Sequence, residues 1–265
     1  MGDAALARAV PFRGGGFLPR TSRLAACLAF VAVLAIWQAA VTLGWVSPVF
    51  LPSPYEIGRA LHDLAVTGAL WGHVSVSLIR IALGWALGTV CGLAVGTAMA
   101  LFSLARSVGL PMVSALFPIP KIALLPLLIL WLGIGETSKV TTIALGVFFP
   151  TVIAAYSVID SVPRNLIRMA QSFDVPFRDI VRKIAFPGAL PAILSGMRVS
   201  ASIALLLLVS AEMIGAERGI GAFVLQAGNL MQTDQLMAGV AVLSALGLTI
   251  GTVLSWAERK LLAWR

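Results

Sequence analysis

The chain has 265 residues, of which 59% are hydrophobic and 11% are charged, and its mean hydropathy is +0.98. Soluble domains carry roughly 25% charged residues, so this composition excludes a water-soluble globule and indicates a protein embedded in a bilayer. The formal net charge of +8 does not indicate nucleic-acid binding, because the basic residues are spread among the segments between apolar runs. We therefore expect membrane lipids, and no nucleic acid, among the partners.

Six apolar stretches are long enough to cross a bilayer, which takes about 20 helical residues. They lie at 24–44, 75–103, 110–133, 140–159, 189–213 and 236–257. The fold class that they predict is all-α, a polytopic membrane protein of six transmembrane helices. We divide the chain into a basic tail at 1–23, a transmembrane domain at 24–258 that includes a loop at 160–188, and a C-terminal tail at 259–265.

The first stretch follows a basic tail, as the core of a signal peptide does. It is longer than a typical signal core and five further stretches follow it, so we expect an uncleaved span. Cys27 and Cys91 lie within apolar stretches, which favours plain packing over a disulfide or a metal site. Neither His62 nor His73 has a second group of ligands near it in sequence, so we expect no metal.

The basic residues between the stretches predict the orientation, because cytoplasmic loops are enriched in Lys and Arg. The loops of one side carry Arg59, Lys139 and Arg218. The loops of the other side carry Arg8, Arg13, Arg20, Arg23, Arg106, Arg164, Arg168, Arg178, Arg182, Lys183, Arg259, Lys260 and Arg265. Both termini and the loop at 160–188 are therefore predicted to be cytoplasmic. On the outer side, residues 54–73 have a modest apolar periodicity that favours a short interfacial helix.

The second stretch carries Gly84, Gly88, Gly92 and Gly96 at every fourth position, on one face of a helix. Small residues at this spacing let another helix approach closely in lipid. One interpretation is packing within the chain, and the other is an interface that slides during transport.

The third stretch contains Pro111, Pro118, Pro120 and Pro126, each of which removes a backbone N–H and breaks or kinks a helix. Irregular backbone at membrane depth is tolerated inside protein or beside a water-filled cavity, so we expect this stretch to line a pathway. Lys121 is its candidate functional residue, because a lysine at the membrane centre costs roughly 2.5–3.5 kcal/mol. Near the interface its side chain would instead extend to water, and no function would follow.

Other charged residues fall inside or beside the apolar stretches. We expect Arg80 to be an anchor at the outer surface and Arg198 to be a more buried charge. Glu212 closes the fifth stretch, where an ion pair with a basic residue and a contact with a solute are both possible. Lys121, Arg198 and Glu212 are therefore our tentative residues of the translocation path. Glu136 and Lys139 are predicted to lie in a short, solvated outer loop.

Residues 163–187, which we name the coupling segment, form a polar and basic interruption of the apolar pattern. Apolar residues recur at helical spacing in each half, as Leu166, Met169, Ala170 and Phe173, and then as Phe177, Ile180, Val181 and Ile184. Pro176 excludes a helical Val175 and separates the halves. The pattern predicts a helix-turn-helix finger at the cytoplasmic surface, which suits docking into a groove of a soluble partner.

The coupling segment resembles the cytoplasmic loop of permease subunits of bacterial binding-protein-dependent ABC importers. The family pattern is Glu-Ala-Ala, three residues, Gly, nine residues, Ile, one residue, Leu-Pro. The matching positions hold Arg168, Met169, Ala170, Asp174, Ile184, Phe186 and Pro187, without a gap. Arg168, Met169, Asp174 and Phe186 depart from the usual Glu, Ala, Gly and Leu. Glycine reaches positive φ without penalty and aspartate does so less readily, so the departure at 174 bears on the turn.

Three further segments resemble the nitrate, sulfonate and taurine branch of these permeases, in the same order and spacing. They are LPSPYEI at 51–57, FPIPKIALLPLLILWLGIGETSK at 117–139 and VSAEMIGAERGIGAFVLQAGN at 209–229. The resemblance therefore runs from about Leu24 to the C-terminus. It implies a multi-pass protein of the bacterial inner membrane, with Glu212 near the outer half of the translocation path.

The resemblance also implies partners. The chain would be a transport subunit rather than an enzyme, and ATP and Mg would be bound by separate ABC ATPase subunits. These would contact Arg168, Met169, Ala170, Phe173, Asp174, Ile180, Ile184 and Pro187. A periplasmic or lipid-anchored solute-binding protein would deliver a small anion such as a sulfonate, taurine or nitrate. A second permease copy, as a homodimer, would complete the pathway, and this chain itself would bind no cofactor.

Two alternatives belong to other classes of protein. An ion-coupled secondary transporter or channel would use Lys121, Arg80 and Glu212 as gating charges, but it leaves the coupling segment unexplained and the sequence has no obvious inverted repeat. A membrane enzyme would need clustered ionisable groups near one interface. The sequence has no such cluster, no phosphate-binding glycine loop and no nucleophile elbow.

Overall fold

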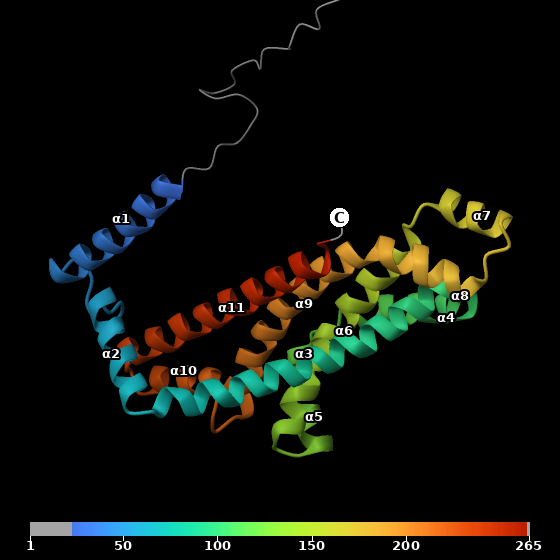
Figure 1. Ribbon diagram of the computed structural model, residues 1–265. Helices are drawn as coiled ribbons and strands as arrows, with labels where there is room; N and C mark the ends of the chain where they lie inside the picture. Colours follow the sequence, from blue (N-terminus) through green and yellow to red (C-terminus); the bar gives the residue numbers. More distant parts are fainter. Residues whose placement is uncertain (1–22, 264–265) are drawn as a thin grey trace, which may run out of the picture. The chain divides into compact units, whose positions relative to one another are not determined.

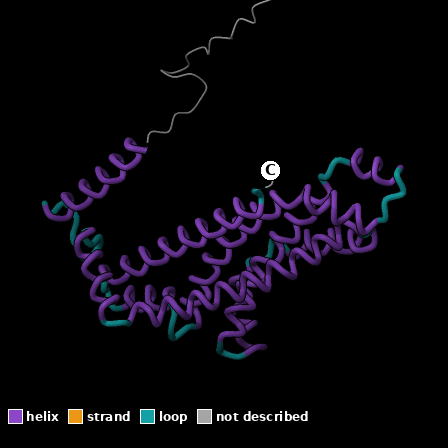
Figure 2. The backbone as a smooth tube through the Cα atoms, in the orientation of Figure 1, coloured by secondary structure: helices purple, strands orange, loops and turns teal. Residues whose placement is uncertain are grey.

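A computed structural model describes residues 23–263. Helices make up most of this part of the chain and it contains no strand (Figure 2), so the predicted all-α class is confirmed. The chain divides into two compact units, Met1–Tyr55 and Glu56–Arg265. The predicted N-terminal tail falls outside the described residues, apart from Arg23.

The first unit contains α1 (Arg23–Thr42), whose apolar residues match the first predicted span. The helix ends where Gly44 adopts a φ of 74°, a left-handed conformation that favours glycine. The side-chain oxygen of Gln38 accepts a hydrogen bond from the backbone N–H of Tyr55 at 3.2 Å. This bond ties the last turns of α1 to Tyr55, the second residue of α2 (Pro54–Val66).

The second unit is built around long helices that run side by side (Figure 1). Its elements in chain order are α2 (Pro54–Val66), which starts in the first unit, α3 (Ala69–Leu101), α4 (Ser103–Leu116), the 3₁₀-helix η1 (Lys121–Leu124), α5 (Leu125–Leu132), α6 (Glu136–Asp160), α7 (Arg164–Ser172), α8 (Phe177–Ile180), the π-helix η2 (Val181–Ala185), α9 (Phe186–Gly215), α10 (Ile220–Asn229) and α11 (Thr233–Leu261). Figure 1 shows α10 near one end of this unit and α7 near the other.

In the described part of the chain, five helical segments are long and apolar enough to span a membrane: Leu24–Thr42, Ala69–Leu101, Glu136–Asp160, Phe177–Gly215 and Thr233–Leu261. A sixth span exists if α4 and the η1–α5 segment are counted together, but these are bent by 86°. Of the two effects expected of the prolines in the stretch at 110–133, a kink or a break, the structure therefore has the break. The break falls at Pro118 and Pro120, which cannot donate the backbone hydrogen bonds of a continuous helix.

Several predicted boundaries also shift. The interfacial helix predicted at 54–73 ends at Val66, and α3 begins at Ala69, after Gly68 with a φ of 79°. The last helix continues to Leu261, past the predicted domain boundary at 258. The fifth span begins within the coupling segment, because α8, η2 and α9 follow one another without a break from Phe177 to Gly215.

The predicted glycine face of α3 lies against α6. A Cβ atom added to Gly84, Gly88, Gly92 or Gly96 would lie 2.5–2.8 Å from an atom of α6, closer than real Cβ contacts. The two helices therefore approach at a distance that glycine alone permits. This contact occurs within one chain, as the packing interpretation expects.

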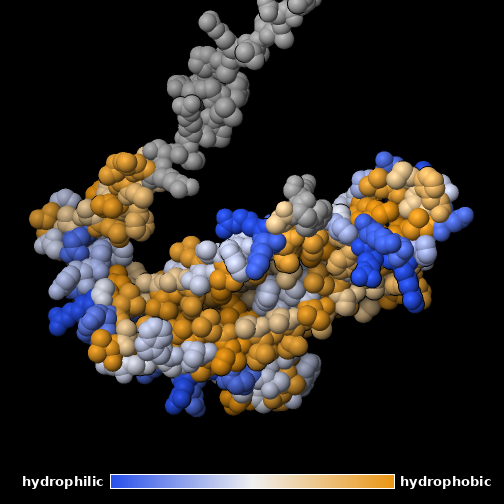
Figure 3. Space-filling view, viewed as in Figure 1, coloured by the Kyte–Doolittle hydropathy of each residue, from blue (hydrophilic) through white to orange (hydrophobic). Residues whose placement is uncertain are grey.

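The core of the second unit lies between α3, α6 and α9. One buried cluster comprises Ile81, Ile143, Val147, Ala204 and Leu208. A second cluster joins α3 and α6 to α4, through Met99, Val113, Phe149 and Val152. Figure 3 shows apolar side chains over most of the visible flank of the long helices, as expected for a surface that faces lipid.

Candidate functional site

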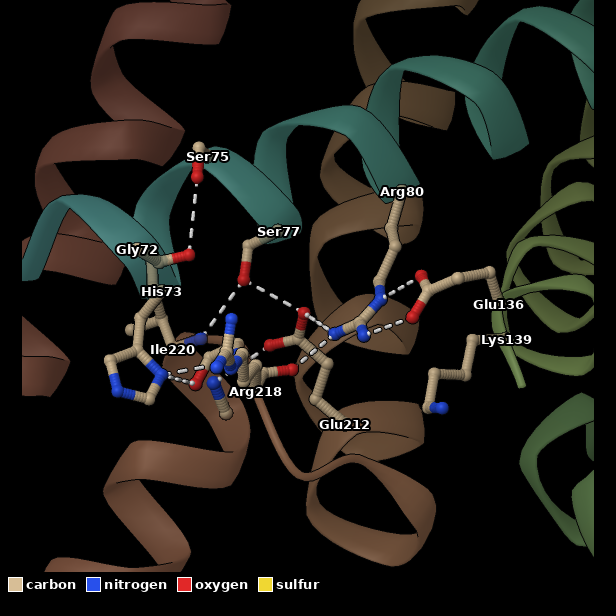
Figure 4. A network of polar contacts seen from close by, with 12 residues as sticks. Gly72, His73, Ser75, Ser77, Arg80, Glu136, Lys139, Glu212, Arg218 and Ile220 are labelled. Carbon is tan, nitrogen blue, oxygen red and sulfur yellow. Dashed lines mark hydrogen bonds and ion pairs between the residues drawn. The ribbon is translucent and has the colours of Figure 1, made fainter. Parts of the chain in front are cut away.

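A network of polar groups, most of them buried, joins α3, α6, α9 and the start of α10 (Figure 4). We name it the polar network; it comprises Ser77, Arg80, Glu136, Glu212 and the backbone of 218–221. Arg80 stands at its centre and is 3% exposed. Its Nε and Nη2 donate to the two carboxylate oxygens of Glu136, both at 2.6 Å, and its Nη1 donates to Glu212 at 2.7 Å. One guanidinium therefore connects three helices.

Glu212 is fully buried, and its carboxylate has several donors. Oε1 accepts from Ser77 Oγ and from Arg80 Nη1, both at 2.7 Å, and Oε2 accepts from the backbone N–H of Gly221 at 2.8 Å. Ser77 Oγ in turn accepts from the backbone N–H of Ile220 at 2.9 Å. Because the first N–H groups of a helix lack partners within it, Ser77 and Glu212 satisfy the N-terminus of α10.

The loop before α10 depends on glycine. Gly219 has a φ of 134°, and a Cβ atom there would lie 2.5 Å from Glu212 Oε2. Gly221 is also closely packed, because its Cβ would lie 2.7 Å from the carbonyl oxygen of Val209. The backbone can therefore wrap around the Glu212 carboxylate, and the Arg218 carbonyl accepts from Arg80 Nη1 at 2.6 Å.

The polar network corrects three expectations from the sequence. Arg80 is a buried centre rather than an anchor at the outer surface. Lys139 is 5% exposed rather than solvated, and its Nζ donates to the Gly135 carbonyl at 3.0 Å. Glu136 keeps an exposed side chain, as expected, but it belongs to α6 and pairs with Arg80. Hydropathy could locate these charges but could not tell which of them meet across helices.

Arg198 lies elsewhere than predicted. Its side chain is 44% exposed and forms an ion pair with Glu258 of α11, so it is not the more buried charge. The same carboxylate accepts a long hydrogen bond from Ser195 Oγ at 3.5 Å. Of the three tentative path residues, the structure places Glu212 in the polar network and Arg198 outside it.

Lys121, the third tentative path residue, caps the broken helix. Its Nζ donates to the carbonyls of Leu116, Phe117 and Ile119, at 2.7, 3.0 and 2.7 Å. The ammonium also lies 4.4 Å from the centre of the Phe149 ring, within range of a cation–π interaction. A positive charge at the end of α4 satisfies carbonyls that have no partner within the helix. These contacts account for Lys121 without a bound solute.

The first half of the coupling segment folds as predicted. Helix α7 keeps Leu166 and Met169 exposed, at 41% and 55%, and Phe173, the residue at its C-cap, is 77% exposed, while Ala170 is 6% exposed. Arg168 is also exposed. Large apolar side chains that face outward at helical spacing form a surface suited to a partner.

Asp174 adopts the conformation that glycine would take at its position, with a φ of 54°. The N–H of Val175 donates to the carbonyl of Ala170 at 3.1 Å, and the N–H of Asp174 donates to that of Gln171 at 3.0 Å. These two bonds form a Schellman motif, the common end of a helix. The turn is therefore made with aspartate in place of glycine.

The second half of the coupling segment differs from the predicted short helix. Ile180 is 6% exposed, so it contributes to the chain's own packing, whereas Phe177 is 56% exposed. Pro187 lies at the start of α9, directly after the π-helix η2. A π-helical turn changes the hydrogen-bond pattern before the proline, and the helix continues through it.

The residues of the polar network that the sequence analysis missed are Ser77, Gly219 and Gly221. Ser77 bonds Glu212, which lies 135 residues further along the chain, and no sequence pattern indicates such a contact. The two glycines flank Ile220 at the start of α10, and that placement was the one available signal. Within residues 23–263, no group of three His, Cys, Asp or Glu residues is arranged to hold a metal ion. The polar network can hold helices together and can present a fixed guanidinium.

Comparison with known proteins places this geometry in a family. Residues 88–262 match the family described as "Binding-protein-dependent transport system inner membrane component". The chain is 36% identical to the taurine transport system permease protein TauC of Escherichia coli K12, over 88% of this chain and 86% of that protein. It is 38% identical to the putative aliphatic sulfonates transport permease protein SsuC of Bacillus subtilis 168, over 88% and 84%.

Solved structures share the fold. A chain of the MetNI methionine ABC transporter in an inward-facing conformation matches with a TM-score of 0.62 and 22% identity, over 72% of this chain and 95% of that one. An amino acid ABC transporter crystallised with histidines matches with a TM-score of 0.58 and 18% identity, over 76% and 97%. The likeness supports the architecture of an importer permease.

Proposed function

We propose a function from one established premise: the chain belongs to the family of binding-protein-dependent transport system inner membrane components. It is a permease subunit of an ABC importer, a multi-span membrane protein and a transport component rather than an enzyme. The alternative of a secondary transporter or channel is not favoured, since it gives no role to the coupling segment.

The coupling segment and both termini lie in the cytoplasm, and the polar network lies toward the outer side. The distribution of Lys and Arg supports this orientation. The burial of Lys139 makes the difference between the two sides larger, because this lysine was counted with the outer loops and is not in one. The outer loops then carry two basic residues, Arg59 and Arg218.

ABC ATPase subunits receive the coupling segment in a surface groove, and they bind the ATP and Mg that drive transport. The observation that carries this proposal is the exposed apolar row of α7, Leu166, Met169 and Phe173, held in place by the Schellman turn at Asp174. Arg168, Ile184 and Pro187 complete the matching positions. Ala170 and Ile180 act from within, because both are buried in the chain itself. Closure of two ATPase subunits moves two such segments and switches the permease between two states.

A second permease copy and a solute-binding protein complete the importer. One chain with at most six spans provides half of a pathway, so a homodimer with two-fold symmetry is the arrangement we propose. A periplasmic or lipid-anchored solute-binding protein delivers the solute to the outer side. The named substrates of the relatives, taurine and aliphatic sulfonates, support a small anion of the sulfonate, taurine or nitrate class.

The test is co-purification of the tagged chain from its native cell in mild detergent, followed by mass spectrometry. We expect an ABC-type ATPase with the wild type. The double variant Met169→Asp, Phe173→Asp should retain about one-thirtieth of that ATPase or less, since the loss of even one anchor side chain of an interface costs about 2 kcal/mol, or about thirtyfold in affinity.

The matched control is Asn165→Asp, which adds a charge at an exposed polar position of the same helix. It should co-purify with the ATPase as the wild type does. Wild-type preparations that repeatedly lack any ATPase would refute the proposed partner. Equal recovery from the double variant would refute the proposed docking surface.

A further inference from the structure

We propose that the Nε and Nη2 edge of Arg80 is a binding site for the sulfonate group of the transported solute, and that the Glu136 carboxylate occupies it when no solute is present. This inference rests on the proposed function, because it assumes that the chain transports an anion. It assigns the recognition of the anionic group to the permease itself, at a site between α3 and α6.

The guanidinium of Arg80 is held in place from the side opposite to Glu136. Its Nη1 donates to the buried Glu212 and to the Arg218 carbonyl, at 2.7 and 2.6 Å. Glu212 is fixed in turn by Ser77 and by the backbone of Gly221. Removal of Glu136 would leave these bonds in place. The Nε and Nη2 donors would then be preorganised for another acceptor, which lowers the cost of binding it.

Glu136 can leave Arg80 and be replaced by a solute, whereas Glu212 cannot. Its side chain is 64% exposed, whereas that of Glu212 is fully buried. Among residues 23–263, the Arg80 guanidinium is the partner that its carboxylate contacts. Glu136 is also the first residue of α6 and follows Gly133 and Gly135, the first with a φ of 86°. Its carboxylate can therefore move into water without exposing a core.

The geometry of the Arg80–Glu136 pair matches a sulfonate. Two parallel N–H···O bonds of 2.6 Å join the guanidinium edge to two oxygens of one carboxylate. Arginine forms this bidentate arrangement with planar or tetrahedral oxyanions, which present two oxygens at a similar spacing. A sulfonate can take the place of Glu136 on the same two donors.

Lys139 supplies a second positive charge at this place. It lies one helical turn after Glu136 on α6 (Figure 4) and is 5% exposed. Within the described chain, the Gly135 carbonyl is the acceptor that its ammonium contacts, so two of its three N–H donors remain for another group.

The charge balance favours an anion in exchange for Glu136. With Glu136 turned to water, the buried Arg80 and Lys139 have Glu212 as their buried counter-charge, and Glu217, whose charge also acts on Lys139, is exposed to water. A buried charge without a counter-ion is costly, so the site then binds a negative group. A sulfonate at Arg80 restores equal numbers of positive and negative charges.

The experiment measures binding of ethanesulfonate to the purified transporter complex in lipid nanodiscs, without the solute-binding protein, by titration calorimetry. In the wild type, Glu136 competes for Arg80, and the apparent affinity falls by the fraction of time that the site is free. The variant Glu136→Gln weakens this competitor, and we expect its Kd for ethanesulfonate to be about tenfold lower or more. Neutral ethanesulfonamide should bind neither protein.

Two comparisons make the result specific. Asp63→Asn removes the same charge from a residue of α2 whose side chain is 64% exposed, as that of Glu136 is, and it should leave the Kd unchanged. Adding Arg80→Lys to Glu136→Gln should abolish the gain, because lysine lacks the bidentate edge. If that double variant does not fold, Lys139→Gln in the Glu136→Gln background provides the second comparison. Its Kd should be several-fold higher than that of Glu136→Gln alone.

An unchanged Kd for Glu136→Gln, or no measurable binding by either protein, would overturn the inference. An equal gain in Asp63→Asn would overturn it as well, because that result assigns the gain to net charge. The proposed function is tested by a different experiment. It is refuted by the absence of an ATPase partner, whereas this inference fails if the importer works and Glu136→Gln leaves binding unaltered.

Discussion

The polar network buries charged side chains, whereas the coupling segment exposes apolar ones. At the polar network, Arg80 and Glu212 are charged, buried and hydrogen-bonded to each other, so this region satisfies its costly groups within the chain. At the coupling segment, Met169 and Phe173 are apolar and exposed, so the chain itself does not bury them and a partner can. The difference separates a region built to hold helices from one built to dock.

The largest effect that tests this difference is expected when Arg80 is replaced. Arg80→Leu leaves Glu212 buried without its counter-ion, and we expect the free energy of unfolding to fall by about 3–5 kcal/mol. The double variant Arg80→Leu, Glu212→Leu should recover part of that loss, because no unpaired charge remains in it. Titration with sodium dodecyl sulfate in mixed micelles measures these changes.

The matched control for Arg80 is Arg198→Leu. Arg198 also forms an ion pair, but its side chain is 44% exposed, so its loss should cost about 1 kcal/mol or less. Equal losses for Arg80→Leu and Arg198→Leu would show that burial does not set the value of these pairs. A double variant as unstable as Arg80→Leu would assign the loss to packing instead.

The contact between α3 and α6 joins the two regions, and Gly88 tests it. A Cβ atom at this position would lie 2.5 Å from the backbone carbonyl oxygen of Ala144, which cannot rotate away. We expect Gly88→Ala to lower the free energy of unfolding by about 1–3 kcal/mol, since overpacking forces the backbone to shift. Thermal unfolding followed by circular dichroism measures the change.

Gly72→Ala is the control on the same helix. No heavy atom lies within 4 Å of a Cβ there, and alanine favours a helix over glycine by up to about 1 kcal/mol. This variant should therefore be as stable as the wild type or more stable. If Gly88→Ala behaved in the same way, the close approach of α3 and α6 would not contribute to stability.

The sequence predicted those features that depend on local pattern. The apolar spacing of α7 and the glycine face of α3 repeat within one helix, so periodicity locates both. The partners of Arg80 could not be predicted in this way, because Glu136 and Glu212 come from other helices and the sequence does not say which charges meet. The depth of Arg80 and Arg198 was misjudged for the same reason.

The second half of the coupling segment was misjudged for a different reason. The sequence predicted that the second half of the coupling segment is a helical part of a finger at 163–187, separate from the span at 189–213. The π-helix η2 directly precedes α9, and the helix from Phe177 continues into the fifth span. A sequence pattern with a period of 3.6 residues does not reveal a π-helical turn. Residues such as Ile180 thus belong to the core rather than to the docking surface.

The smallest expected effect concerns Asp174, within the coupling segment. A left-handed conformation costs an ordinary residue about 1–2 kcal/mol and aspartate less than that, because its short polar side chain can bond locally. Asp174→Gly removes this cost but adds the entropy that glycine loses on folding, about 0.5–1 kcal/mol. We expect the turn to gain less than about 1 kcal/mol, and the global stability to change little.

Hydrogen exchange of the Val175 amide measures this local change, because that N–H closes the Schellman motif on Ala170 at 3.1 Å. Exchange should be slower in Asp174→Gly than in the wild type and faster in Asp174→Ala, which keeps the steric cost and loses the polar side chain. Equal exchange in all three proteins would mean that the exposed row of α7 does not depend on this turn. The coupling segment would then owe its shape to the partner rather than to its own sequence.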